Sequence, residues 1–291
     1  MNTLKQKLIN GLYGCAVADA VGNPFEFKTN INPNVVIDYA NSTNKLVISD
    51  DTQMTMFGFE TMHNNDLSSS NRDLVKSCFT SAYVDWYETQ KIYVSQHKSY
   101  TDCLLSFKSM WSIQAPGMTC LDSLESINRL EPVENDSMGC GSVMRLLPVM
   151  GFLNEYALSN VVKFGKITGS ITHKHVANDT AIEKYIKNAY DIIHGDVPRD
   201  RIDGYQSHKV SDLGEGWIAP ECVDMAILAY TQAETFDELL QLSISHDGDS
   251  DSVAAVAGSF WGLSGREVPQ KYINKLDALD SIKYVINNYI E

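Results

Sequence analysis

The sequence has few of the features that mark membrane, secreted or zinc-binding proteins. No apolar run approaches the roughly 20 residues that span a bilayer. Asn10, Gly11 and Asp19 interrupt the segment where the apolar core of a secretory signal would lie. The six cysteines are scattered, without a C-x-x-C pair or a Cys/His cluster of zinc spacing. We therefore expect a cytoplasmic protein with reduced cysteines.

Basic residues are also scarce. The chain has 23 Lys and Arg against 37 Asp and Glu, a formal net charge of −14, and its densest basic stretch runs only from Lys184 to Lys187. Such a charge repels a nucleic-acid backbone, so nucleic acid is not expected as a partner. Binding of one phosphorylated small molecule through backbone amides stays open. Part of the acidic excess suits hard divalent cations, which prefer carboxylate ligands.

Helical spacing dominates what is present. Apolar residues recur every three or four positions, as at Leu4, Leu8 and Leu12, and 44% of the residues are hydrophobic, which permits a large core. Strand signals are limited to residues 35–37 and 46–48. The sequence therefore predicts an all-α fold. None of its loops, including 30–44 and 194–216, is long or biased enough for a linker, so we expect a single domain over residues 1–291.

Two acidic clusters stand at predicted helix starts: Ser49-Asp50-Asp51 and Asp249-Ser250-Asp251-Ser252. A helix N-cap explains a single such cluster, because Ser and Asp side chains accept the first-turn amides. Neither cap needs more than one of these groups, and like charges buried together require a cation between them. Oxygen-only ligands favour Mg²⁺ or Mn²⁺ over zinc, and about four carboxylates suffice for two ions.

Three further segments carry candidate chemistry. Glu26 lies between two phenylalanines and is either an acid/base group of raised pKa or a solvent-facing loop residue. The glycines of the 135–145 segment let backbone amides approach a diphosphate, although a tight structural turn explains them equally well. His173 is either beside a ligand or a structural group at a helix end. Arg145 is either a substrate clamp or an internal strut paired with a carboxylate.

Taken in order, these segments resemble the ADP-ribosylglycohydrolase family. Ser49 and Ser252 stand where threonine is usual in that family, which keeps a ligand oxygen, and Asp247 adds a charge where glycine is usual. The resemblance extends over the segments Gly14–Gly22, Pro24–Phe27, Ser49–Met54, Ala115–Cys120, Asn135–Arg145 with Pro148, Thr172–His173, Gly216–Ala219 and Gly248–Ser252.

The resemblance implies a compact, single-domain orthogonal helical bundle with a di-metal cleft. Two Mg²⁺ ions, or Mn²⁺, would be the cofactors, and Glu26, Asp50 and Asp251 would be catalytic. The remaining positions follow by matching the family's motifs. The metal ligands would be Ser49, Asp50, Asp51, Asp249, Asp251 and Ser252, and the ADP-ribose-binding residues would be Ser137, Met138, Gly139, Cys140, Gly141 and His173.

The implied activity is hydrolysis of the N- or O-glycosidic bond between ADP-ribose and a modified acceptor, which reverses mono-ADP-ribosylation. Two alternatives stay open: a catalytically silent ADP-ribose-binding protein on the same scaffold, and a metal-dependent phosphohydrolase. A monomer acting on an ADP-ribosylated protein or small molecule is expected, with no membrane partner. ADP-ribosylated nucleotide substrates are not excluded. The sequence does not distinguish arginine, serine or a base as the acceptor.

Overall fold

The computed structural model describes residues 3–63, 72–91, 103–198 and 208–290. Within these ranges the chain forms helices and no strand, and its sheet-like pairing is limited to two isolated bridges, Leu46 with Leu276 and Gly139 with Ile218. The predicted all-α class is confirmed. None of the described helices combines the length and the apolar character that crossing a bilayer requires.

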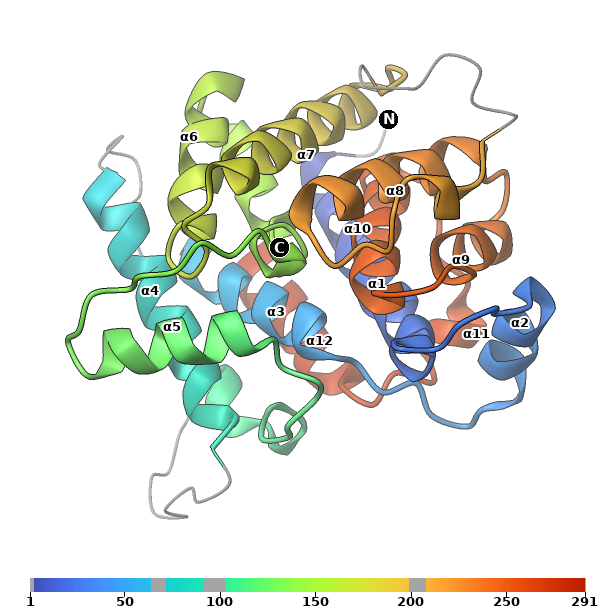
Figure 1. Cartoon of the computed structure of the whole chain (residues 1–291), viewed down its shortest axis with the longest axis horizontal. Helices are drawn as coiled ribbons and strands as arrows, with labels where there is room; N and C mark the ends of the chain where they lie inside the picture. The colour runs from blue at the N-terminus through green and yellow to red at the C-terminus, as the bar shows by residue number, and fades with distance from the viewer. Residues whose placement is uncertain (1–2, 64–71, 92–102, 199–207, 291) are drawn as a thin grey trace.

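The longer helices come in chain order with short 3₁₀ turns between them (Figure 1). The α-helices are α1 Leu4–Gly22, α2 Pro33–Ser42, α3 Asp50–His63, α4 Arg72–Thr89, α5 Met118–Asn128, α6 Leu158–Gly169, α7 Val176–His194, α8 Ala219–Gln232, α9 Phe236–Ile244, α10 Ser250–Leu263, α11 Gln270–Ile273 and α12 Leu279–Val285. The 3₁₀ segments are η1 Asn23–Phe25, η2 Leu104–Ser106, η3 Lys108–Met110, η4 Cys140–Ser142, η5 Leu147–Asn154 and η7 Val210–Asp212, and η8 Ile286–Ile290 is a π-helical turn.

Helices α1 and α10 form the centre of the fold and make the most extensive contact between any two elements (Figure 1). Their backbones touch at glycines. A Cβ added to Gly14 would lie 2.1 Å from the Gly258 carbonyl oxygen, and one added to Gly258 would lie 2.1 Å from that of Gly14. At the end of α1, a Cβ on Gly22 would lie 2.8 Å from the Cα of Asp251. The contact therefore brings the start of α10 against the segment that carries Glu26.

The other helices surround this pair. Figure 1 shows α4, α5 and α6 on one side of it and α2, α9 and α11 on the other. Helix α10 is buried along its whole length and also packs against α8 and α9. Because its residues are small between Val253 and Gly258, neighbouring helices approach it closely.

The structure corrects one detail of the sequence prediction. Residues 33–42, expected in a loop with a strand signal at 35–37, form helix α2. The reason is local: the Asn32 side chain accepts the amide of Asn34, and Pro33 occupies the first helical position, where its missing N–H costs nothing. Val36 and Ala40 are then buried on one face. The second predicted loop, 194–216, begins after α7 and contains η7, and its residues 199–207 lie outside the described part.

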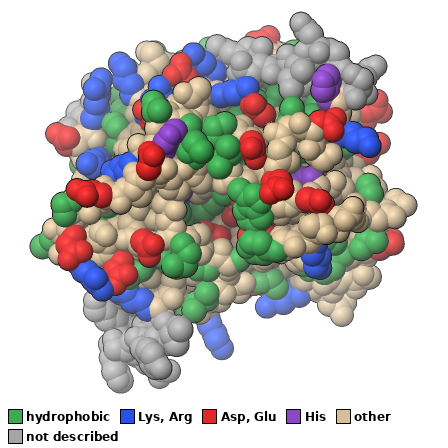
Figure 2. All heavy atoms as spheres, in the orientation of Figure 1, with side chains coloured by type: hydrophobic (Ala, Val, Ile, Leu, Met, Phe, Trp, Pro, Cys, Tyr) green, Lys and Arg blue, Asp and Glu red, His purple; other side chains and the backbone are tan. Residues whose placement is uncertain are grey.

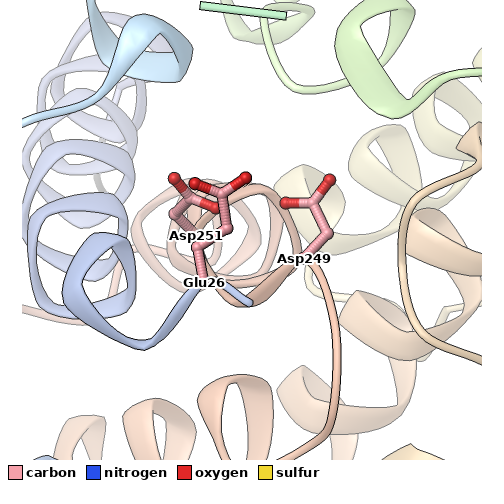
Figure 3. Close-up of side chains that lie close together, drawn as sticks. All are labelled: Glu26, Asp249 and Asp251. Carbon is pink, nitrogen blue, oxygen red and sulfur yellow. The ribbon is translucent and has the colours of Figure 1, made fainter. Parts of the chain in front are cut away.

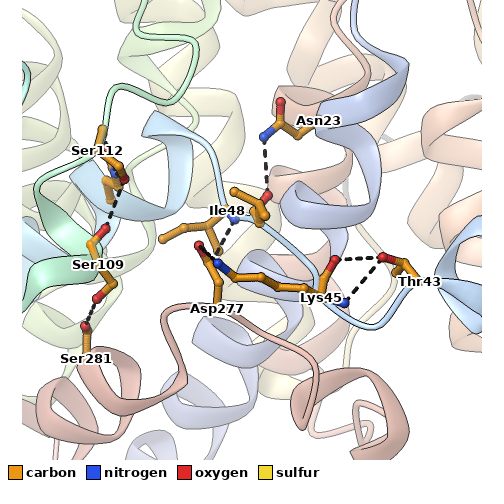
Figure 4. Close-up of polar contacts among 10 residues, drawn as sticks. Asn23, Thr43, Lys45, Ile48, Ser109, Ser112, Asp277 and Ser281 are labelled. Carbon is orange, nitrogen blue, oxygen red and sulfur yellow. Dashed lines mark hydrogen bonds and ion pairs between the residues drawn. The ribbon is translucent and has the colours of Figure 1, made fainter.

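The segment before α3 is fixed by contacts with the carboxyl-terminal part of the chain. The Leu46 amide donates to the Lys275 carbonyl at 2.9 Å, and the Asp277 amide returns a bond of the same length to the Leu46 carbonyl. The Asp277 side chain accepts the Ile48 amide at 3.2 Å, and Asn23 donates to the Val47 carbonyl at 3.3 Å (Figure 4). These bonds set the position at which the next residue, Ser49, begins the first acidic cluster.

Candidate active site

The two acidic clusters lie at the first turns of α3 and α10. One group in each cluster caps its helix: Ser49 Oγ accepts the Asp51 amide at 3.2 Å, and the Asp249 side chain accepts the Ser252 amide at 3.2 Å. Asp251 Oδ1 also accepts the Ser252 amide, at 3.1 Å, whereas the carboxylates of Asp50 and Asp51 accept no first-turn amide of α3 among the described residues. Both helix ends are positive, which favours anionic side chains there.

Three carboxylates converge between the end of η1 and the start of α10. Oxygen atoms of Glu26, Asp249 and Asp251 all lie within 4.8 Å of one another. Figure 3 shows the three side chains pointing into the same opening, with Glu26 beside Asp251 and Asp249 across from them. The two aspartates are almost fully buried and Glu26 is partly exposed. Three oxygens at this spacing match the donor set that a hard cation requires.

The first cluster adds two buried carboxylates to the same site. Asp50 accepts the Gly117 amide at 3.3 Å. Asp51 accepts the Ser49 hydroxyl on Oδ2 at 3.1 Å, whereas its Oδ1 is buried without a hydrogen-bond partner among the described residues. An orphaned carboxylate oxygen in a dry site is costly unless a cation binds it. The donor set therefore fits Mg²⁺ or Mn²⁺.

Asp19 supports the first cluster from behind. Its carboxylate accepts the Ser49 amide at 3.0 and 3.1 Å, the Thr52 amide at 3.2 Å and the Thr52 hydroxyl. Because Asp19 is fully buried on α1, these bonds hold the first turn of α3 against the central helix. Sequence reasoning noted this aspartate in a motif but gave it no role.

The acidic groups raise one another's pKa values. Burial, followed by the charge of Asp251, raises the pKa of Asp50 and Asp51 well above the usual carboxyl range. The same two causes raise the pKa of Asp19 to about 7 and that of Glu26 to about 8. Among the described residues, no Lys or Arg lines the cavity beside them. Without a bound cation, part of this cluster therefore holds protons at neutral pH.

The carboxylates lie at one end of a cavity of about 330 Å³. Among the predicted residues, Ser49, Ser137 and Met138 do not line this cavity. A larger hollow of about 700 Å³ between η7 and α9 contains none of the predicted residues. Those that line the smaller cavity are Glu26, Asp50, Asp51, Gly139, Cys140, Gly141, His173, Asp249, Asp251 and Ser252.

The 135–145 segment with Gly139 and Gly141, called the glycine loop, is held by hydrogen bonds within the protein. The Gly139 amide donates to Ser137 Oγ at 3.2 Å, and the Cys140 amide donates to the Trp217 carbonyl at 3.0 Å. These two amides are therefore already engaged. Gly139 has an ordinary φ of −52°, so its backbone does not require glycine; instead, a Cβ there would lie 3.0 Å from His173 Nε2. The small residue leaves room for that ring.

Residues 1–290 match the family model described as ADP-ribosylglycohydrolase. The chain belongs to the ADP-ribosylglycohydrolase family. Membership of this family supports a glycohydrolase role, and the family is metal-dependent in general.

Two known proteins illustrate the range of similarity. A solved structure described as an ADP-ribosylglycohydrolase-related protein complex shares the ADP-ribosylglycohydrolase fold with a TM-score of 0.64, 16% identity and 98% coverage of both chains. A protein of Archaeoglobus fulgidus, described only as uncharacterized, is 24% identical over 162 residues, which are 47% of this chain and 53% of the relative. The matched region thus spans about half the length of that curated relative.

An aromatic pair at the mouth of the site was missed by sequence reasoning. Phe27 stacks on Trp217 with ring centroids 5.0 Å apart and is 74% exposed. Its φ is +64°, an uncommon value for a bulky residue, and its amide donates to the Gly248 carbonyl at 3.4 Å. Asp247, where the ADP-ribosylglycohydrolase family usually has glycine, accepts the Asn30 amide at 2.7 Å. The loop carrying Glu26 is thus joined to the loop before α10.

The stability of the metal-free protein should fall as pH rises from about 5 to 8. Asp19 and Glu26 have pKa values of about 7 and about 8 in the folded chain, above the values of 3.8 and 4.5 for free groups. The folded state then holds protons that the unfolded state releases, so raising the pH favours unfolding. Thermal unfolding in EDTA at four pH values measures this slope. Mg²⁺ should flatten it, and a stability that rises with pH in EDTA would contradict the assignment.

Proposed function

We propose that the protein is a cytoplasmic, monomeric hydrolase that removes ADP-ribose from a modified protein or small molecule by cleaving the glycosidic bond at the anomeric carbon. One observation carries the proposal: five carboxylates, from the residue after η1 and from the starts of α3 and α10, line one cavity together with the glycine loop and His173. Family membership supports the same activity. We also propose that residues 1–291 form a single domain.

The proposed cofactors are two Mg²⁺ ions, or Mn²⁺. Asp50 and Asp51 would supply ligands from α3, and Asp249 and Asp251 from the start of α10, because these four carboxylates are buried and line the cavity. Cations bound there supply Lewis-acid stabilisation of the charge that develops as the glycosidic bond breaks. Ser49 donates to Asp51 and Cys140 Sγ donates to Asp249 at 2.8 Å, and these hydrogen bonds orient both carboxylates.

Glu26 is the proposed acid/base group. It is half-buried beside Asp251 and lines the cavity from a loop outside both ligand clusters. A carboxyl group whose pKa is about 8 in the metal-free site can hold or accept a proton near neutral pH. In this role it moves the proton between water and the leaving group while the glycine loop and His173 bind ADP-ribose.

Glu26→Gln should lower turnover by roughly 100-fold, the usual contribution of a positioned acid or base. ADP-ribose affinity should change little, because the substitution keeps the size and polarity of the side chain. Steady-state kinetics and an ADP-ribose titration measure the two quantities. Glu215→Gln is the matched control, since Glu215 is an exposed carboxylate that contacts Trp217 and does not line the cavity. Equal turnover in the two variants would make Glu26 a bystander.

The test of the function itself is product analysis on a panel of arginine-, serine- and nucleotide-linked ADP-ribose substrates, with Mg²⁺, Mn²⁺ or EDTA. We expect release of free ADP-ribose that depends on the metal. Release of phosphate or AMP would instead identify a phosphohydrolase. Tight ADP-ribose binding with no turnover of any substrate would identify a binding protein on the same scaffold.

A further inference from the structure

Arg145 is a buried cation without a carboxylate among the contacts that the structure gives it. It is 1% exposed, and its Nη2 donates to Thr172 Oγ1 at 2.6 Å while Nη1 donates to Cys120 Sγ at 3.3 Å. The guanidinium lies over the Tyr83 ring, 4.4 Å from its centroid. Arg145 does not line the cavity. Its role is therefore internal, but the carboxylate partner expected for a strut is replaced by a hydroxyl, a thiol and a ring face.

The direction of the hydrogen bond between Arg145 and Thr172 is fixed by chemistry. A guanidinium has donors only, so Thr172 Oγ1 is the acceptor in its contact with Arg145. The same Oγ1 lies 2.8 Å from His173 Nδ1. The single hydroxyl proton of Thr172 has two neighbouring acceptors, that nitrogen and the Cys120 sulfur. Sulfur is the weaker acceptor and already receives a hydrogen bond from Arg145, which favours a hydrogen bond from the Thr172 hydroxyl to Nδ1.

An Nδ1 that accepts a hydrogen bond determines the protonation state of the whole ring. Burial, followed by the positive charge of Arg145, lowers the pKa of His173 to about 3, so the ring is neutral at physiological pH. A neutral imidazole that accepts at Nδ1 carries its proton on Nε2. His173 lines the cavity, and its Nε2 lies 3.0 Å from the place of a Cβ on Gly139. The N–H is thus presented at the wall formed by the glycine loop.

The backbone that carries the pair is also fixed. The Thr172 carbonyl accepts the Ser123 hydroxyl at 2.9 Å and the Asn135 side-chain amide at 2.8 Å. Among the residues that the structure describes, Thr172 is the one hydrogen-bond partner of the His173 ring. The orientation of His173 therefore depends on this hydroxyl.

We propose that Arg145 and Thr172 are positioning residues that hold His173 as the Nε2–H tautomer, so that its ring donates a hydrogen bond to a phosphate or ribose oxygen of the bound nucleotide. The ligand in this statement rests on the proposed function, whereas the tautomer does not. Arg145 acts through Thr172 and touches no ligand. The arrangement supplies a neutral hydrogen-bond donor to a cavity whose acidic lining residues, among those described, are not balanced by any Lys or Arg.

The tautomer is tested by two-bond ¹⁵N–¹H NMR on the full chain labelled with ¹⁵N-histidine, without metal or ligand. The chain has seven histidines, and loss of one signal set in His173→Gln identifies the ring. We expect a protonated Nε2 and an unprotonated, hydrogen-bonded Nδ1. Thr172→Val keeps the shape and removes the hydroxyl, so the Nδ1 resonance should move. Thr172→Ser is the matched control and should keep it. A protonated Nδ1 in the wild type, or an unmoved resonance in Thr172→Val, overturns the proposal.

The binding role is tested by titration of ADP-ribose, diphosphate and ribose into the same variants. Thr172→Val should weaken ADP-ribose binding about tenfold, or 1.4 kcal/mol, and Thr172→Ser should restore it. The fragment, diphosphate or ribose, whose affinity also falls in Thr172→Val contains the oxygen that accepts the hydrogen bond. A Thr172→Val affinity within twofold of wild type refutes the role of the ring as a donor. The expected tautomer in a chain that does not bind ADP-ribose would refute the proposed function and this ligand role, while the positioning by Thr172 would stand.

Discussion

Asp251→Asn is expected to abolish hydrolysis and to remove the stabilisation that Mg²⁺ gives to the folded chain. After burial, the charge of Asp251 is the next cause that raises the pKa of Glu26, Asp50 and Asp51, so this member of the second cluster lies close to the first cluster and to Glu26. Loss of one ligand from a shared metal site removes several kcal/mol of transition-state stabilisation, which corresponds to roughly 1,000-fold in rate. Kinetics and calorimetric titration with Mg²⁺ measure both effects.

The matched control for this prediction is Asp280→Asn. Asp280 occupies the first turn of α12 as Asp251 occupies that of α10, but it is exposed and does not line the cavity. The control loses the same favourable interaction with a helix dipole, worth about 0.3–1 kcal/mol, and should keep full activity. Wild-type Mg²⁺ affinity and stoichiometry in Asp251→Asn would show that the two clusters do not form a common metal site.

Gly14→Val should lower the free energy of unfolding more than the other proposed substitutions do. Even a Cβ at this position would lie 2.1 Å from the Gly258 carbonyl oxygen, on a backbone that cannot swing aside as a side chain can. Overpacking usually costs about 1–3 kcal/mol, and a backbone collision at the central helix pair should reach or exceed the top of that range. Thermal unfolding followed by circular dichroism should show a midpoint lower by at least roughly 6 °C.

Gly117→Ala provides the comparison. Gly117 has an ordinary φ of −61°, and nothing lies within 4 Å of the place where its Cβ would stand. Alanine there should change the free energy of unfolding by no more than about 1 kcal/mol. If Gly14→Val unfolded at the wild-type temperature, α1 and α10 would not be in backbone contact.

The sequence predicted the features that depend on neighbouring residues. The helix starts at Asp50 and Ser250 follow from capping groups beside them, which is why the two clusters were found at helix ends. It failed at residues 35–37, because the β-branched run indicated a strand while the Asn32 cap and the burial of Val36 decided for a helix. Periodicity in so short a run does not separate the two structures.

The features that the sequence could not predict join distant segments. Nothing near Phe27 indicates that it meets Trp217, and nothing near Cys140 indicates that its thiol reaches Asp249. Acidic and basic side chains are interspersed on the face shown in Figure 2, an arrangement that the net charge alone does not reveal. The sequence offered a substrate clamp or a strut paired with a carboxylate for Arg145, because no pattern near it indicates the ring face and the hydroxyl that surround it.

The contact between Gly14 and Gly258 also bears on how the chain is made. A ribosome adds about 5–20 residues per second, so α1 is complete for on the order of ten seconds or more before α10 exists. During that time the face of α1 that packs on α10 has no partner, and contacts this distant in sequence form slowly. The carboxylates of Asp50 and Asp251 can therefore meet only after α10 has been made, and until then the face of α1 that packs on α10 lacks that partner.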